Sequence, residues 1–186
     1  MKVRLAAPLQ TDSIVDGEGI RAVIWMQGCS HNCQGCHNPD THNFKGGYEV
    51  DIDEVKEEID CLNFADGITL SGGDPLFQID ASLEIAKYAR SKSLNVWCYT
   101  GYTFEQLLVM SRCNENLFEL LKNIDVLVDG KFDITQFSMN VVFRGSKNQR
   151  IIDVASSLNQ NKAIEVEKYK SKDNEGHLKL EEAIFI

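Results

Sequence analysis

The sequence lacks the features that mark membrane, exported and nucleic-acid-binding proteins. It has no run of about 18 apolar residues, which argues against a membrane-spanning helix. Its first residues lack the long apolar core of a signal peptide, so we expect a cytoplasmic protein. The net charge of −9 argues against binding to a nucleic-acid backbone, because such binding requires a basic surface.

Repeats, low-complexity tracts and proline-rich linkers are also absent, and the 186 residues include only 3 prolines. Nothing in the composition therefore separates two domains. Dividing a chain of this length would leave too little hydrophobic core for either part, so we expect a single domain overall.

The chain does contain an alternation of short apolar runs and helical patterns. Five runs are typical of buried strands: residues 21–27, 67–70, 95–99, 124–128 and 140–143. Four segments have helical patterns: residues 51–64, 78–92, 103–122 with a break near 113–116, and a turn near 148–157. This order predicts parallel strands joined by crossover helices. Because eight such units need about 250 residues, we expect an α/β partial TIM-like barrel of about five or six units.

The C-terminal part has a different pattern. Residues 163–168 alternate apolar and charged side chains, and residues 178–186 are largely apolar. Turn-forming residues lie between these two stretches. The pattern predicts a β-hairpin-like tail that covers an edge of the barrel.

Polar and glycine-rich segments lie directly after the expected strands. In parallel α/β folds the carboxyl ends of the strands form the functional site, so we expect these segments to converge on one mouth. They are GCSHNCQGCHNP, SGGDP, TGY, DGKF and RGSKNQR.

Three of the six cysteines, Cys29, Cys33 and Cys36, fall within eight residues. Cysteines of a cytosolic protein stay reduced, so this grouping favours one metal site, and we expect Cys61, Cys98 and Cys113 to be packing thiols. Thiolates suit iron–sulfur clusters, zinc and copper(I). A 4Fe–4S cluster held by three cysteines keeps one iron open for substrate. The alternative is a structural zinc site whose fourth ligand is His31, His37 or His42.

Two further places in the sequence suit a bound small molecule, one through its backbone and the other through a side chain. Glycines in Ser71-Gly72-Gly73-Asp74-Pro75 let backbone carbonyls approach a ligand, and a free carbonyl can accept a hydrogen bond from an ammonium group. Asp129 at a strand end can bind a cation or a ribose hydroxyl, or cap the next helix.

The triplet Cys29-x3-Cys33-x2-Cys36, in a glycine-rich loop after a strand, resembles the signature of radical S-adenosylmethionine enzymes. The resemblance implies that these cysteines hold a 4Fe–4S cluster and that S-adenosylmethionine is split to methionine and a 5′-deoxyadenosyl radical. SGGDP resembles the family's Gly-Gly-Glu motif, with Asp74 in place of Glu. The cosubstrate-binding residues expected on this basis are Gly35, Cys36, His37, Ser71, Gly72, Gly73, Asp74, Thr100 and Asp129.

Within that superfamily the chain resembles the activating proteins of anaerobic ribonucleoside-triphosphate reductase. The segments that carry this resemblance are IVDGEGIR, residues 28–39, ITLSGGDPL, YTGYT, IDVLVDGKF and FRGSKNQRI. It implies a radical SAM core domain over residues 1–152 and an extension over 153–186. It also implies that the radical abstracts hydrogen from a glycine of the large reductase subunit, with flavodoxin or ferredoxin as electron donor.

Other members of the superfamily give alternative interpretations. Enzymes that make 7-carboxy-7-deazaguanine share the GEG segment, but typically have Asp after the third cysteine and Glu in the glycine motif. His37 and Asp74 at these positions favour the activating protein. Pyruvate formate-lyase activators share DGEGIR and CHN but tend to be longer. A non-catalytic iron–sulfur or zinc module would not need the other strand-end motifs. An aromatic residue often precedes the third cysteine, whereas Gly35 stands there in this chain.

Overall fold

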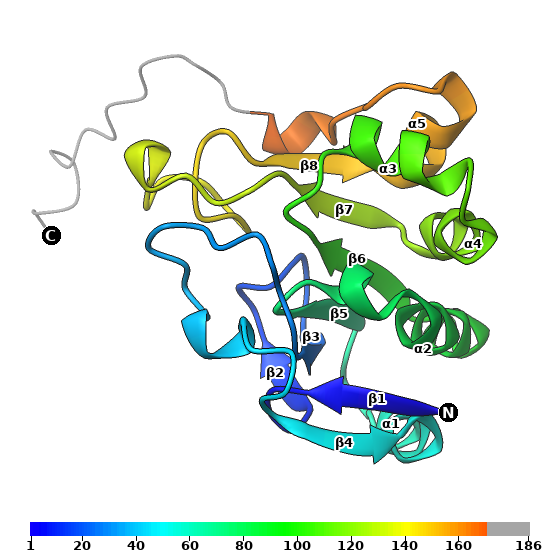
Figure 1. The fold of residues 1–186 in the computed structure, drawn as a ribbon. Coiled ribbons are helices and arrows are strands. Elements are labelled where there is room, and N and C mark those ends of the chain that lie inside the picture. Colours follow the sequence, from blue (N-terminus) through cyan, green and yellow to red (C-terminus); the bar gives the residue numbers. More distant parts are fainter. Residues whose placement is uncertain (171–186) are drawn as a thin grey trace, which may run out of the picture.

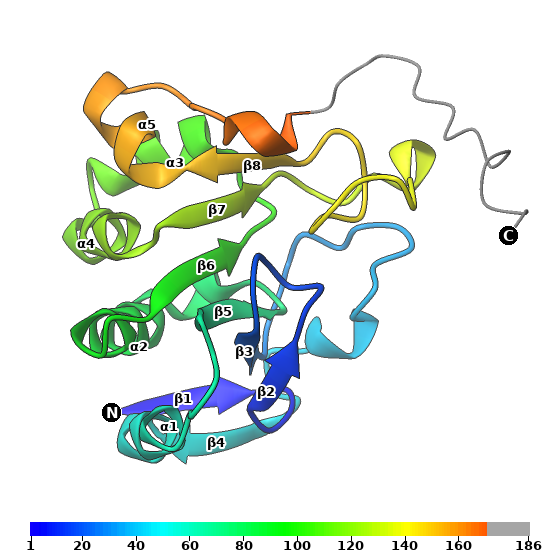
Figure 2. The same cartoon turned by 180° about the vertical axis from the view of Figure 1, so that it is seen from behind.

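The computed structural model describes residues 1–170 as a mixed α/β fold built on one eight-stranded sheet. Along the sheet the strands follow the order β4 (Tyr48–Asp51), β1 (Lys2–Leu5), β3 (Arg21–Met26), β5 (Gly67–Gly72), β6 (Asn95–Tyr99), β7 (Val126–Asp129) and β8 (Arg150–Asp153), and β2 (Gln10–Ser13) pairs with β3. The loops after the parallel strands gather at the end of the sheet away from helices α1 (Ile52–Asp60), α2 (Ile79–Ser91) and α4 (Glu115–Asn123) (Figures 1 and 2). None of the helices in residues 1–170 is long and apolar enough to cross a bilayer.

The centre of the sheet is parallel, as the strand–helix alternation predicts. Its strands are β3 (Arg21–Met26), β5 (Gly67–Gly72), β6 (Asn95–Tyr99) and β7 (Val126–Asp129). The connecting helices are α1 (Ile52–Asp60), α2 (Ile79–Ser91), α3 (Phe104–Ser111) and α4 (Glu115–Asn123). The expected break between residues 113 and 116 is confirmed, because Asn114 accepts a hydrogen bond from Leu117 N–H and caps α4.

The edges of the sheet differ from the expectation, because they are antiparallel. The strands β1 (Lys2–Leu5), β2 (Gln10–Ser13) and β4 (Tyr48–Asp51) were not predicted. Each has only four residues, too few for a clear period of two, and β2 and β4 are mostly exposed. The sheet thus has four parallel strands rather than five or six βα units, and within residues 1–170 its edge strands β4 and β8 do not pair with each other.

The fifth strand was predicted in the wrong place. Residues 140–143 form turns and bends, and Phe143 has a positive φ of 54°. The strand is β8 (Arg150–Asp153), which runs antiparallel to β7, and helix α5 (Val154–Gln160) follows it. The predicted helical turn over 148–157 is therefore only partly helical, because it includes the strand β8 and the start of α5. The helix begins after Asp153, whose side chain caps α5 by accepting a hydrogen bond from Ser156 N–H.

Half of the expected tail hairpin lies outside the described residues, namely 178–186. In the described half, Glu165 forms a single antiparallel bridge with Ile152, and a short 3-10 helix (Glu167–Tyr169) follows. The segment therefore covers the sheet edge without forming a strand.

Side chains alternate between two cores on the two faces of the sheet. Val96 and Cys98 of β6 point into the large core beneath the helices, whereas Trp97 packs with Val128 and Ile151 on the other face. The second core is covered by Phe143 and by the segment around Tyr169. This alternation follows from the period of two in a strand.

Candidate active site

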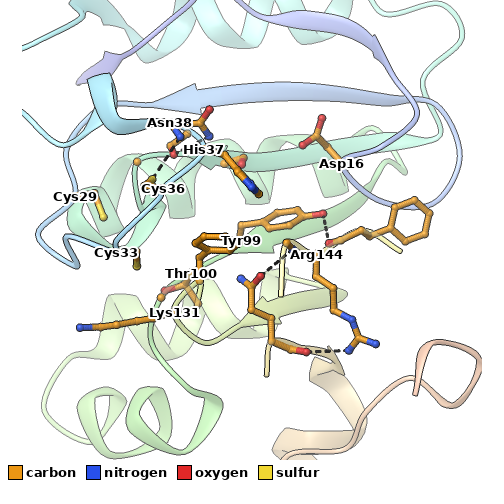
Figure 3. Close-up of a pocket in the computed structure, with 18 of the residues that line it drawn as sticks. Asp16, Cys29, Cys33, Cys36, His37, Asn38, Tyr99, Thr100, Lys131 and Arg144 are labelled. Atoms are coloured by element: carbon orange, nitrogen blue, oxygen red, sulfur yellow. Dashed lines mark hydrogen bonds between the residues drawn. The ribbon is translucent and has the colours of Figure 1, made fainter. Parts of the chain in front are cut away.

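A cavity of about 780 Å³ lies at the carboxyl ends of the parallel strands. Figure 3 shows the three cysteines at one side of this cavity, Asp16 and Arg144 at the other, and Tyr99 between them. Every strand-end segment singled out from the sequence contributes to the lining, which includes Cys29, Ser71, Thr100, Lys131 and Gly145. The expected convergence on one mouth is therefore present in the fold.

The loop that carries the cysteines is shaped by residues in the left-handed region. Asn32 has φ of 52° and Gly35 has φ of 72°, so the chain turns sharply on both sides of Cys33. Cys36 N–H donates to the Cys33 carbonyl at 3.2 Å, and Asn38 N–H lies 3.4 Å from Cys36 Sγ. All three sulfur-bearing side chains are partly buried and line the cavity.

The cysteine side chains sit in an environment that disfavours a free thiolate. Burial raises the pKa of Cys29 and of Cys33, and backbone hydrogen bonds from His31 and Phe132, respectively, oppose this effect. A bound metal reverses that preference, since thiolates bind metals in the deprotonated form.

The same loop offers the kind of donor that an iron–sulfur cluster uses. Among residues 1–170, no three His, Cys, Asp or Glu side chains converge closely enough to hold one metal ion. A 4Fe–4S cluster does not require such convergence, because each thiolate binds a different iron. Three thiolates around one cavity therefore match the donor set of a cluster.

The histidines weighed as zinc ligands have other contacts. His31 Nε2 lies 2.7 Å from Asp74 Oδ2, which places its ring under the loop. The His37 ring packs 4.7 Å from the Phe132 ring, and both residues line the cavity. His42 makes its contact through the main chain, where its carbonyl accepts a hydrogen bond from Cys29 N–H, and both His31 and His42 belong to the cavity lining.

The glycines of the SGGDP segment permit close packing against the cysteine loop. Gly72 has φ of 101°, and a Cβ there would lie 2.5 Å from the Met26 carbonyl oxygen. A Cβ on Gly73 would lie 2.5 Å from the Gly28 carbonyl oxygen. Ser71, Gly72 and Gly73 line the cavity, whereas Asp74 lies behind it with a side chain that is 1% exposed.

Asp129 and Gly35 also lie outside the cavity lining. Asp129 Oδ2 accepts a hydrogen bond from Phe104 N–H, the first residue of α3, and the Asp129 side chain is paired with Arg150. At Gly35, an added Cβ would lie 3.1 Å from Ile134 Cδ1, so the Ile134 side chain occupies the space beside it.

The DGKF and NQR segments lie side by side where β7 ends and β8 begins, and side-chain contacts join them. Arg150 pairs with Asp129, Gln149 Nε2 donates to the Gly130 carbonyl at 3.1 Å, and Asn148 Nδ2 donates to the Lys131 carbonyl at 2.8 Å. These contacts extend the antiparallel register, in which Asp129 already faces Arg150, by side chains instead of backbone. They fix the loop that brings Lys131 and Phe132 to the cavity.

Several lining residues were not assigned individually from the sequence. Asp16, Tyr99 and Arg144 line the cavity, and Tyr99 OH donates to the Phe143 carbonyl at 2.8 Å. The available signal was their position in the DGEG, YTGY and RGS segments, which marked the region but not the side chain that points inward.

Comparisons with known proteins agree with this site. The family described as 4Fe–4S single cluster domain matches residues 15–152. The anaerobic ribonucleoside-triphosphate reductase-activating protein of Enterobacteria phage T4 is 35% identical over 144 residues, which is 74% of this chain and 86% of the phage protein. The proteins of the same name from Haemophilus influenzae (35% over 148 residues, 74% and 90% covered) and Escherichia coli (33% over 144 residues, 73% and 90% covered) are similar.

The three cysteines of one loop, the glycine turn beside them and these similarities in sequence lead to the same assignment. The chain belongs to the family of anaerobic ribonucleoside-triphosphate reductase-activating proteins, and its residues 15–152 form a 4Fe–4S single cluster domain.

Proposed function

We propose that this chain cleaves S-adenosylmethionine reductively and generates a glycyl radical on an anaerobic ribonucleoside-triphosphate reductase. One electron breaks a sulfur–carbon bond of the sulfonium, giving methionine and a 5′-deoxyadenosyl radical. That radical takes a hydrogen atom from a glycine α-carbon, giving 5′-deoxyadenosine and the glycyl radical. The observation that carries the proposal is a single cavity lined by three cysteines and by the strand-end glycine turn. The relatives' name supplies the reductase as the target.

Cys29, Cys33 and Cys36 are the proposed ligands of the cluster. When bound, the cluster supplies the electron and an iron that no cysteine occupies, where S-adenosylmethionine can be chelated. The Asn38 N–H near Cys36 Sγ stabilises negative charge on that sulfur. The backbone of Phe132 does the same at Cys33.

The cosubstrate lies, in this proposal, along the strand ends beside the cluster. Carbonyl groups of the turn at Ser71–Gly73 can accept hydrogen bonds from its ammonium group. His37 and Thr100 border the same cavity. Gly35, Asp74 and Asp129 lie outside the lining, so we assign them to the shape of the site rather than to direct contact.

We infer that the sheet is a short form of the radical SAM partial barrel. Support comes from its four parallel strands, with helices on one face and site loops at the carboxyl ends. The mouth is bordered by the exposed apolar side chains of Ile14, Val15 and Val142, which also line the cavity. An open apolar border suits a peptide segment that carries the target glycine. We further propose flavodoxin or ferredoxin as the electron donor.

The test is an anaerobic reconstitution with the reductase of the same organism. Iron-loaded protein should be brown, should release 5′-deoxyadenosine from S-adenosylmethionine when reduced, and should give the reductase a glycyl radical doublet in electron paramagnetic resonance. Replacing Cys29, Cys33 or Cys36 with Ala should abolish all three results.

The matched controls are Cys61→Ala and Cys113→Ala, because both residues are exposed and neither lines the cavity. Both variants should behave as the native chain does. A colourless zinc protein would contradict the cluster assignment. Release of 5′-deoxyadenosine without the doublet would indicate another substrate, such as that of a pyruvate formate-lyase activator or a 7-carboxy-7-deazaguanine enzyme.

A further inference from the structure

The buried carboxylate of Asp74 joins three loops that follow three different strands. Its Oδ2 accepts hydrogen bonds from Thr100 Oγ1 at 2.8 Å and from Gly101 N–H at 2.9 Å, both in the turn after β6. The same oxygen lies 2.7 Å from His31 Nε2 in the cysteine loop after β3. Its Oδ1 accepts from Leu76 N–H in its own turn after β5.

The His31 side chain is enclosed on its remaining sides. Its ring packs edge-on against Tyr102, with centroids 4.7 Å apart, and against Phe77 at 5.6 Å. A Cβ on Gly101 would lie 2.4 Å from His31 Cδ2, so a side chain at position 101 would displace the ring. Only 8% of the His31 side chain is exposed, and the residue also belongs to the lining of the cavity.

The backbone adds two links at the same place. Asp74 N–H donates to the Gly28 carbonyl at 3.0 Å, and Gly73 N–H donates to the Met26 carbonyl at 2.7 Å. The position of the Asp74 main chain is thus fixed against the start of the cysteine loop. The Asp74 carboxylate, one methylene away from this main chain, reaches both His31 and Thr100. The longer side chain of a Glu at position 74 would carry the carboxylate past these two partners in a fully buried place.

We propose that His31 and Asp74 are positioning residues that set the separation between the cysteine loop and the Ser71–Gly73 turn. The inference rests on the proposed function, in which S-adenosylmethionine contacts both elements at once. A ligand that spans two loops loses affinity when their separation varies, and misplacement by about 1 Å can cost about 100-fold in rate. The His31–Asp74 link joins side chains of the two elements at 2.7 Å, and the longer contact of Asn38 Nδ2 with the Gly72 carbonyl, at 3.4 Å, is a second side-chain link between them.

The experiment measures S-adenosylmethionine binding to the reconstituted, reduced protein by its effect on the cluster's electron paramagnetic resonance spectrum. His31→Phe keeps a ring between Tyr102 and Phe77 but removes the donor. It should retain its iron and bind S-adenosylmethionine about 10-fold or more weakly, as expected for the loss of a buried hydrogen bond to a charged group. His31→Gln, whose Nε2 can donate to Asp74, should recover affinity to within about threefold of native.

A double-mutant comparison tests whether the two residues act together. Asp74→Ala should weaken binding, and adding His31→Phe to it should have no further effect, because the link is already lost. The matched control is Ser157→Ala, which removes the hydroxyl that accepts from Ile164 N–H at 2.8 Å in another buried place. It should lower the melting temperature without changing affinity for S-adenosylmethionine.

Several outcomes would overturn the inference. These are native affinity in His31→Phe, additive losses in the double variant, and loss of iron from His31→Phe, which would make the residue a requirement for the cluster itself. Failure of the native chain to bind S-adenosylmethionine would instead refute the proposed function, so the two failures are distinguishable.

Discussion

Replacing Arg150 with Leu should destabilise the fold substantially, because it leaves a buried carboxylate without its cation. Asp129 is 1% exposed, and Arg150 contacts its two oxygens through Nε at 3.0 Å and Nη2 at 2.5 Å. Arg150 also makes two hydrogen bonds to Glu105 on α3. In Arg150→Leu, Asp129 keeps only the hydrogen bond from Phe104 N–H among those in the structure's described part.

The expected cost follows from the burial of the pair. Breaking a buried ion pair by removing one partner costs about 3 to 5 kcal/mol, and we expect about 3 kcal/mol because the Arg150 side chain is 29% exposed and water can reach the site. For a chain of this size, a loss of about 3 kcal/mol corresponds to a fall of about 6 to 12 °C in melting temperature.

The assay is thermal unfolding of the apo protein followed by circular dichroism. Arg150→Lys should fall between native and Arg150→Leu, because lysine cannot contact both carboxylate oxygens in a planar fork. The control is Lys2→Met, which breaks the exposed pair Lys2–Glu49 and should leave the melting temperature nearly unchanged. A melting temperature of Arg150→Leu no lower than that of the control would refute the reasoning.

Three further predictions concern the same region and its neighbours. Arg150 lowers the pKa of Glu105 to about 2 from its usual 4.5, so the ionised carboxylate stabilises the fold above about pH 4.5 and this contribution is lost as the pH falls toward 2. In urea unfolding at a series of pH values, the unfolding free energy of Glu105→Gln should fall less between pH 4.5 and pH 2 than that of the native chain. Parallel plots of unfolding free energy against pH would contradict this prediction. Gly72→Ala should be more destabilising than Gly130→Ala, although both glycines have a positive φ. A Cβ at Gly72 would clash with backbone at 2.5 Å, whereas the nearest atom to a Cβ at Gly130 is 3.8 Å away. Equal unfolding midpoints would show that the positive φ alone determines the loss of stability. Tyr99→Phe removes a partly buried hydroxyl that donates to the Phe143 carbonyl, and it should cost about 1 kcal/mol in chemical unfolding. An unchanged unfolding midpoint would mean that water replaces the hydrogen bond.

The interior of the fold could be predicted from the sequence because its strands are continuous apolar runs. Residues 95–99 were expected as a strand and form β6 without a change of bounds. The edge strands could not be found in the same way: β2 (QTDS) has three exposed residues of four, and its strand state comes from pairing with β3 rather than from its own pattern.

The sequence predicts which segments form the site, but not which way their side chains point. The cysteine loop and the glycine turn were expected at one mouth, and they line one cavity. The side chain of Asp74 was expected to face the cosubstrate, and the structure directs it away, toward His31. A sequence motif locates the backbone near a ligand, whereas side-chain direction depends on partners that are 26 to 43 residues distant along the chain, as in the contacts of Asp74 with Thr100 and His31.

The reversed direction of β8 has a consequence for how this protein can vary. A parallel strand after β7 would have needed a crossover back to the opposite end of the sheet, with a helix packed on its face. An antiparallel β8 instead lets the chain leave β7 and return without departing from the mouth, so residues 130–149 are a hairpin connection that carries none of the large core. Its length and its outer side chains, including Met139, can change between relatives while the sheet is unaffected. The outer part of this connection can therefore vary at little cost to the sheet, because Asn148 and Gln149 anchor its base to the carbonyls of Lys131 and Gly130.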